Sequence, residues 1–322
     1  MTRPTIGSLC TGYGGLDMAA AAYFDADVLW VADNHPACVR LLEIHHPGVP
    51  NLGDLTTVDF TTTPPVDILT AGFPCQPFSH AGNRLGEADE RYIWDWIGDA
   101  IGVLRPGLVL LENVPGILTL GGPGVIATLT ELGYDASWGL IRASATGVPH
   151  RRTRWFCVAH PAGTDARQWR RSDLDSQPPT HADVEGSQGH GRPDEVGTSR
   201  RQSVAPCDSP PCEGITDPDG GRREIIWTRD GLEEAEKPPN PCGYAAFGPY
   251  ESAVRSWERQ FGPAPIPTDE RGVTPRFIEW MMALPPGHVT GHGLSRTDEM
   301  ILLGNGVVPA QAYLALSVLF GD

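Results

Sequence analysis

The stretch TIGSLCTGYGG, residues 5–15, decides the expected fold. Thr5–Leu9 is a short apolar run typical of a buried strand, and a helix-like stretch runs from about Gly15 to Phe24. The glycines between them permit a tight turn and let a ligand approach the backbone at the helix N-terminus. A strand, a glycine-rich turn and a helix in this order predict the first unit of an α/β domain.

The same rhythm continues through the first 160 residues. Further strands are expected at Val28–Ala32, Val66–Thr70, Leu108–Leu111 and Trp155–Ala159, and helices at Ala37–His45 and Ile93–Leu104. Regular structure returns at Pro275–Leu284 and in a final helix at about Pro309–Phe320. The pattern predicts a doubly wound, mostly parallel, Rossmann-like sheet that binds its ligands at the carboxyl ends of the strands. We assign residues 1–160 and 271–322 to this domain.

The segment between them has a different composition. From about residue 163 to residue 220 the chain is rich in Ser, Pro, Gly, Asp and Arg, and almost lacks Ile, Leu and Phe. Such a segment buries too little apolar surface to offset its ordering entropy, so we expect a largely irregular, partly disordered insertion. Aromatic residues return later, and they predict a small folded module at roughly 221–268. Residues 161–270 are therefore expected to form a separate, irregular region.

Composition narrows the cellular setting. The chain has seven scattered cysteines, no signal-peptide pattern and no uninterrupted run of about 18 apolar residues, which together predict a cytoplasmic protein outside the membrane. No metal site is expected, because Cys207 and Cys212 lack a matching second pair. The net charge of −16 disfavours a nucleic-acid partner, but the cations are almost all arginines, many of them in clusters such as Arg151, Arg152 and Arg154. Charge alone neither establishes nor excludes DNA.

Two features suggest a nucleoside ligand. The glycine-rich turn lacks the third glycine spacing of a dinucleotide fingerprint, which disfavours NAD. Asp33 follows the second strand, about twenty residues further on, where a carboxylate can bind ribose hydroxyls. The alternative for Asp33 is a helix N-cap ahead of Pro36. These residues leave open which nucleoside is bound.

The next two strands each end in residues that can carry chemistry. GFPCQPFS, residues 72–79, places Cys75 between two prolines at the expected edge of the sheet, where a thiolate of lowered pKa would be a nucleophile. Glu112 and Asn113 follow the strand Leu108–Leu111 and could face the same pocket, or could serve only as a cap before Pro115. Arg152 and Arg154 alternate on an extended segment, either toward that pocket or as surface charge. GNGVVP, residues 304–309, is by itself a turn before a helix.

Taken together and in this order, these elements resemble the DNA cytosine-5 methyltransferase family. The resemblance covers about 1–160 and 270–322, and the combination of PCQPFS, ENV and the C-terminal GNxVxP element is highly specific. It implies S-adenosyl-L-methionine as cofactor and double-stranded DNA as substrate. It also implies a target-recognition role for residues 161–270, a monomer, and a role in a restriction-modification system beside an endonuclease of the same specificity.

The resemblance implies a role for each matching residue. Cys75 matches the nucleophile that attacks C6 of a flipped cytosine, Glu112 the glutamate that contacts N3 and the exocyclic amine, and Arg152 and Arg154 the arginines that support the base and the catalytic site. Asp33 matches the acidic residue on the ribose, and Asp54 the aspartate at the adenine amino group. The residues matching the cofactor pocket are Cys10, Thr11, Gly12, Gly14, Gly15, Asp33, Asp54, Leu55, Asn305 and Val307.

The sequence departs from the family at several of these positions. Cys10 stands where an adenine-stacking aromatic is usual, and Ser8 stands where an acidic residue is frequent. Asp33 replaces a glutamate, His150 a glutamine and Gly306 a small polar residue. Two alternatives stay open, a transfer-RNA cytosine-5 methyltransferase and a catalytically silent DNA-binding homologue. The long variable region before residue 270 favours DNA, and intact Cys75 and Glu112 favour an active enzyme.

Overall fold

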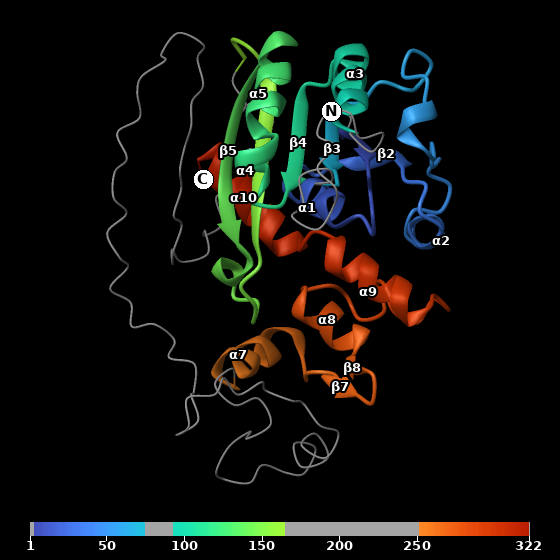
Figure 1. Ribbon diagram of the computed structural model, residues 1–322, viewed down its shortest axis with the longest axis vertical. Helices are drawn as coiled ribbons and strands as arrows, with labels where there is room; N and C mark the ends of the chain where they lie inside the picture. The colour runs from blue at the N-terminus through green and yellow to red at the C-terminus, as the bar shows by residue number, and fades with distance from the viewer. Residues whose placement is uncertain (1–2, 75–92, 165–250, 322) are drawn as a thin grey trace, which may run out of the picture.

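The computed structural model describes residues 3–74, 93–164 and 251–321 (Figure 1). Cys75, the predicted disorder at 163–220 and most of the predicted module at 221–268 therefore lie outside the described residues, apart from the edges of those ranges. Within the described part a six-stranded sheet has the order β2-β1-β3-β4-β6-β5. Its strands are β1 (Thr5–Leu9), β2 (Asp27–Ala32), β3 (Ile68–Gly72), β4 (Leu108–Asn113), β5 (Tyr134–Arg142) and β6 (Thr153–Pro161).

The first four strands run parallel, as the alternating pattern predicted. β1 pairs with both β2 and β3, and β3 pairs with β4, all in parallel. β6 lies between β4 and β5 and is antiparallel to both. The crossover helices of the parallel part are α1 (Gly15–Phe24), α2 (Pro36–His45) with the short η1 (Leu55–Thr57), and α3 (Trp94–Leu104). The doubly wound α/β fold is confirmed.

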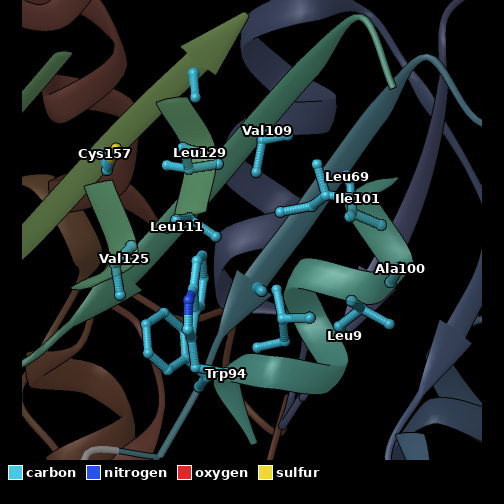
Figure 2. Close-up of a cluster of buried hydrophobic side chains, with 14 of the residues drawn as sticks. Leu9, Leu69, Trp94, Ala100, Ile101, Val109, Leu111, Val125, Leu129 and Cys157 are labelled. Carbon is cyan, nitrogen blue, oxygen red and sulfur yellow. The ribbon is translucent and has the colours of Figure 1, made fainter. Parts of the chain in front are cut away.

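Helices cover both faces of the sheet, which makes three layers (Figure 1). One face packs Leu69, Val109 and Leu111 against α3 and α5 (Gly122–Glu131), which follows the short α4 (Ile117–Leu120). Figure 2 shows this cluster, with Trp94 of α3 turned toward the strands. The other face packs Ile68 and Leu110 against α1 and α10 (Pro309–Phe320).

A smaller group of elements lies at one end of the sheet, the end toward which β5 points (Figure 1). It consists of η3 (Ala143–Thr146), α7 (Glu251–Phe261), the hairpin β7 (Thr268–Asp269) and β8 (Gly272–Val273), α8 (Pro275–Met281) and α9 (Arg296–Asn305). Trp257 of α7 donates its indole N–H to the carbonyl of Trp280, and both side chains belong to one hydrophobic cluster. This group covers the end of the sheet at which the parallel strands reach their carboxyl ends (Figure 1).

Some sequence expectations differ from the structure in detail. The strand expected at Val66–Thr70 is Ile68–Gly72, because Ala71 and Gly72 continue the ladder by pairing with Leu111 and Glu112. Residues 304 and 305, expected in a turn, are the last residues of α9, and the turn occupies residues 306–308. β5 and α5 were not predicted.

The C-terminal segment is more apolar than expected from the sequence, which predicted no run able to span a membrane. By length and mean hydropathy, Arg296–Phe320 meets the criterion for such a span. It is divided here between α9 and α10, since residues 306–308 are not helical and Pro309 begins the second helix. α10 packs against α1 and β5.

Candidate functional site

The glycine-rich loop is fixed by hydrogen bonds at both ends. The Gly14 N–H donates to the Thr11 carbonyl over 2.9 Å, and Gly14 takes φ 83°, a left-handed conformation that favours glycine. The Gly12 N–H donates to Asp33 Oδ2 over 2.9 Å. The loop therefore turns sharply into α1 at the carboxyl end of β1, with its backbone tied to Asp33, the residue that follows β2.

Cys10 begins this loop in a left-handed conformation, φ 51°, and is only partly exposed. Burial, together with the nearby carboxylates of Asp33 and Asp54, raises the pKa of its thiol to about 12. The thiol is therefore neutral at physiological pH. Cys10 lines the pocket between this loop and the turn before α10, where its neutral thiol does not act as a nucleophile.

Asp33 organises the neighbouring edge of the sheet. Its second oxygen, Oδ1, accepts the His35 N–H over 2.9 Å. The Asn51 side-chain amide accepts from the Asp33 N–H and donates to the Asp33 carbonyl. The N-cap of α2 is His35, so the capping alternative for Asp33 itself is wrong. Asp33 lines a pocket together with Asn34, Asn51 and other residues of this edge, namely Val39, Leu42, Glu43, Val49 and Gly53.

Asp54 lies beside this pocket and begins η1. Its Oδ1 accepts from the backbone N–H and the hydroxyl of Thr56, which lower the pKa of Asp54, and its Oδ2 accepts from the Asn34 amide over 3.0 Å. Leu55 is buried directly behind it. The carboxylate is thus held ionised near the surface, within the group of polar side chains around Asp33.

A second pocket lies between the glycine-rich loop and the turn that precedes α10. Its walls come from β1, the loop, α1, β3 and the turn, and are formed by Ser8, Leu9, Cys10, Thr11, Tyr13, Gly15, Leu16, Asp17, Thr70, Gly72, Asn305, Gly306 and Val307. The loop and the turn touch closely here: a Cβ on Gly15 would lie 2.2 Å from the Val307 carbonyl oxygen. Only glycine fits at position 15. Asn305 and Val307, which the resemblance places at the cofactor pocket, both line this pocket.

Glu112, the last residue but one of β4, is a buried carboxyl that is 5% exposed. Its Oε1 lies 3.0 Å from Arg154 Nε in an ion pair, although no N–H in the described residues is directed at that oxygen. Burial raises the pKa of Glu112 to about 7, while the charges of Arg154 and Arg152 act in the opposite direction. The capping alternative does not apply, because the side chain faces Arg154 of β6 across the ladder.

Arg152 reaches from the start of β6 to the turn before α10. Its Nη1 donates to the Gly304 carbonyl over 2.8 Å and its Nη2 to the Gly306 carbonyl over 2.5 Å. The two arginines therefore have different duties: Arg154 pairs with the buried carboxylate, and Arg152 holds the pocket turn. Neither is simply a solvated surface charge.

The chain leading to Cys75 is held next to Glu112. The Asn113 amide donates to the Phe73 carbonyl over 3.1 Å, and β3 pairs with β4 up to Gly72 and Glu112. Cys75 itself lies outside the described residues. A Cβ on Gly72 would lie 3.6 Å from Glu112 Oε2 and 3.7 Å from the Val307 side chain. The Glu112 carboxyl and the turn before α10 therefore both lie close to the end of β3.

Comparison with known proteins decides the family. Residues 5–197, more than half of the chain, match the sequence profile of the C-5 cytosine-specific DNA methylases. The chain belongs to the C-5 cytosine-specific DNA methylase family.

Relatives of this family member include several bacterial enzymes. The chain is 39% identical over 118 residues to the type II methyltransferase M.MspI of Moraxella sp., covering 35% of this chain and 28% of that protein. It is 36% identical over 142 residues to M.BsuFI of Bacillus subtilis, covering 41% and 34%. The chain thus spans about a third of the length of these curated relatives.

Solved structures of other proteins share the fold. A DNMT2 variant of Spodoptera frugiperda superposes with a TM-score of 0.57 at 18% identity, covering 98% of this chain and 99% of that one. A putative DNA modification methyltransferase encoded within a prophage of E. coli gives 0.55 at 19% identity, covering 99% and 100%. At such identities the likeness concerns the fold alone.

His150, which replaces the glutamine expected in this family, has a defined place. Its Nε2 donates to the Met281 carbonyl over 3.1 Å, which ties the start of the arginine segment to the end of α8. Burial and the charge of Arg152 lower the pKa of His150 to about 4, so the ring stays neutral. A neutral side chain donating one hydrogen bond performs the same kind of contact as an amide.

Sequence reasoning missed two residues of this family member. Asp17 of α1 is buried beneath the pocket, accepts the Ser8 hydroxyl over 2.8 Å and also accepts the Thr70 hydroxyl. Ser8, which stands where an acidic residue is frequent, therefore has a carboxylate as its direct hydrogen-bond partner. Tyr13, between two glycines, carries no sequence signal for its role, because its partners Val307 and His288 lie more than 270 residues away in the sequence.

Proposed function

We propose that this protein transfers a methyl group from S-adenosyl-L-methionine to C5 of a cytosine in a specific duplex DNA sequence. The observation that carries the proposal is the buried Glu112–Arg154 pair, 3.0 Å between Oε1 and Nε, beside the strand that leads to Cys75. A catalytic carboxyl of raised pKa at the carboxyl end of a parallel strand fits an acid–base role on a base. Family membership supports the same chemistry.

The residues around the glycine-rich loop fit the cofactor. A glycine cradle that admits no Cβ at position 15, and a carboxylate at the end of β2, suit the amino-acid and nucleoside ends of such a molecule. When bound, S-adenosyl-L-methionine supplies an electrophilic methyl group. The residues proposed to hold it are Cys10, Thr11, Gly12, Gly14, Gly15, Asp33, Asp54, Leu55, Asn305 and Val307.

Cys75 is proposed as the nucleophile. Its thiolate forms a bond to C6 of cytosine, and the electrons of the 5,6-double bond move to C5. C5 would then take the methyl group as the bond between the methyl carbon and the sulfonium sulfur breaks, which leaves that sulfur as a neutral thioether. Loss of the C5 proton to a base restores the double bond as the S–C6 bond breaks and the thiolate leaves. The cysteine is thus regenerated, and the base gains one carbon.

Glu112 is proposed to protonate or hydrogen-bond N3 of the base during the addition. With a pKa of about 7, the carboxyl retains its proton in part of the population at neutral pH, so it can donate to a ring nitrogen. Arg154 holds the carboxyl in place, and Arg152 keeps the turn before α10 next to it. A base in a duplex cannot reach a buried carboxyl, so the cytosine must be flipped out of the stack.

Residues 161–270 are proposed as the target-recognition region, because they interrupt the catalytic domain with a segment of different composition. We also expect a cytoplasmic monomer that belongs to a restriction-modification system, with an endonuclease that recognises the same site. The bacterial type II relatives support that assignment.

The proposal is tested by methylation assays with purified protein and S-adenosylmethionine labelled in the methyl group. We expect label in duplex DNA, and bisulfite sequencing should place it at C5 of cytosine in one short sequence. Cys75→Ser should abolish incorporation. Label found only in transfer RNA would replace DNA by RNA as the substrate, and absence of label in both would refute an active enzyme.

A further inference from the structure

Tyr13 occupies the centre of the glycine-rich loop, yet it is 1% exposed and bound on two sides. Its hydroxyl donates to the Val307 carbonyl over 2.5 Å. Its own carbonyl accepts from His288 Nε2 over 3.0 Å, and the two rings meet edge to face with centroids 5.8 Å apart. One residue of the loop therefore connects two segments from the far end of the chain.

The ring of Tyr13 also determines which residue can occupy position 306. A Cβ on Gly306 would lie 1.8 Å from Tyr13 Cε1 and 2.4 Å from Cζ, far inside van der Waals contact. The ring of Tyr13 therefore requires a glycine at position 306, although the two residues are 293 positions apart in the sequence. Gly306, a departure from the small polar residue usual in the family, has a physical reason in Tyr13.

The turn is held from its opposite side by Arg152. That arginine donates to the carbonyls of Gly304 and Gly306, while Tyr13 donates to the carbonyl of Val307. Three carbonyls of the turn region are therefore fixed by two side chains, one from the cofactor loop and one from the arginine segment beside Glu112. Asn305, Gly306 and Val307 line the pocket together with Tyr13, so the position of the turn sets the width of that pocket.

We propose that Tyr13 is a positioning residue for the cofactor, which sets the distance between the glycine-rich loop and the turn at residues 304–308. The inference rests on the proposed function, since the ligand of the pocket is S-adenosyl-L-methionine. Without the Tyr13 hydroxyl the Val307 carbonyl loses its partner, and the pocket wall formed by the turn is free to move away from the loop. The cofactor then binds a wall that is no longer preorganised.

Tyr13→Phe removes only the hydroxyl and keeps the ring on Gly306. Tyr134→Phe is a matched control, because Tyr134 is equally buried and its hydroxyl donates to the Pro106 carbonyl over 2.7 Å, away from the pocket residues. We expect Tyr13→Phe to weaken cofactor binding about fivefold, the effect of one net hydrogen bond. Tyr134→Phe should lower the melting temperature about as much as Tyr13→Phe does, and should leave the affinity for the cofactor unchanged.

A second pair of variants tests the contact between the ring and the glycine. Gly306→Ala introduces a methyl group that the ring cannot accommodate, and should weaken cofactor binding by about thirtyfold or more. In the double variant, Tyr13→Leu removes the ring edge that the new methyl group would strike. The affinity of the double variant for the cofactor should therefore lie within about threefold of that of Tyr13→Leu alone. Such strong non-additivity is expected only for residues in direct contact.

The experiment is calorimetric titration of the full chain and each variant with S-adenosylmethionine, followed by steady-state kinetics. KM for the cofactor should rise by a larger factor in Tyr13→Phe than kcat falls. Unchanged affinity in Tyr13→Phe while the wild type binds, or additive effects of the Gly306 and Tyr13 changes, would overturn the inference alone. Absence of binding by the wild-type chain would instead overturn the proposed function, and this inference with it. If Tyr13→Phe does not fold, the Gly306→Ala pair decides.

Discussion

The two sides of the site hold their carboxylates in different ways. On the cofactor side, Asp33 is partly exposed, and its oxygens accept the Gly12 and His35 N–H groups. On the base side, Glu112 is 5% exposed and faces Arg154 in an ion pair. The first carboxylate fixes the shape of a loop, whereas the second is withdrawn from water strongly enough to change its proton affinity. We propose that the side around Asp33 fixes the shape of the cofactor site, and that the side around Glu112 serves proton transfer to the base.

The strongest test of this contrast is Glu112→Gln, which keeps the shape of the side chain and removes its proton chemistry. We expect methyl transfer in a single turnover to fall about 100- to 10,000-fold, the range for loss of one acid–base group. Calorimetry should show that the variant still binds S-adenosylmethionine. A fall of less than threefold in the transfer rate would mean that Glu112 is only a structural ion pair.

The buried carboxyl should also make stability depend on pH. The pKa of Glu112 is raised from 4.5 to about 7, so the folded chain retains a proton that the unfolded chain has lost in this window. Stability from this group is therefore greatest below pH 4.5 and is lost as the pH rises toward 7, by at most about 3 kcal/mol. Urea unfolding at pH 5, 6 and 7.5 measures it.

The matched control for that pH series is Glu112→Gln, which cannot titrate. The free energy of unfolding of the wild type, minus that of the variant, should decrease from pH 5 to pH 7.5. A difference that stays constant, or increases, would show that the carboxyl is ionised throughout and that the base side carries no titratable proton.

On the cofactor side the effects should be smaller and should concern binding. Asp33→Ala leaves the Gly12 N–H without its acceptor and removes the carboxylate proposed to meet the ribose. We expect the dissociation constant for S-adenosylmethionine to rise about tenfold, from the loss of one or two charge-assisted hydrogen bonds. Calorimetric titration measures this change, and an unchanged constant would remove Asp33 from the cofactor site.

Asp54→Asn should have the smallest effect of these substitutions. The asparagine retains one oxygen for the Thr56 N–H and hydroxyl, and this side chain lies near the surface, where water can replace lost contacts. We expect affinity for S-adenosylmethionine to weaken about threefold. An effect larger than that of Asp33→Ala would reverse the proposed order of the two aspartates.

Much of the catalytic domain could be predicted from the sequence, because it is built from local signals. The strand Thr5–Leu9, the helix Gly15–Phe24 and the helix Pro309–Phe320 have the predicted bounds, since glycine turns and proline starts mark their ends. β5 lacks such a signal: Ser137 and Gly139 interrupt its pattern, and its pairing with β6 is decided by tertiary contact.

The candidate site likewise contains residues that local motifs predict and contacts that only the folded chain reveals. Cys75, Glu112 and Arg154 could be named from their motifs, because chemistry restricts the residue types that serve. The bonds from Arg152 to the Gly304 and Gly306 carbonyls could not, because backbone acceptors carry no sequence signature. The match of Tyr13 with Gly306 is likewise a packing event between distant segments, visible only once the fold has brought them together.

The most direct test of the account is covalent trapping on duplex DNA that carries 5-fluorocytosine, in a library of random sequence, with S-adenosylmethionine present. Fluorine at C5 cannot leave as a proton does, so the bond from the nucleophile to C6 persists after methyl transfer. We predict a stable protein–DNA complex whose attachment maps to Cys75 by mass spectrometry, and much slower complex formation in Glu112→Gln. Absence of a complex, or attachment at another residue, would contradict the account.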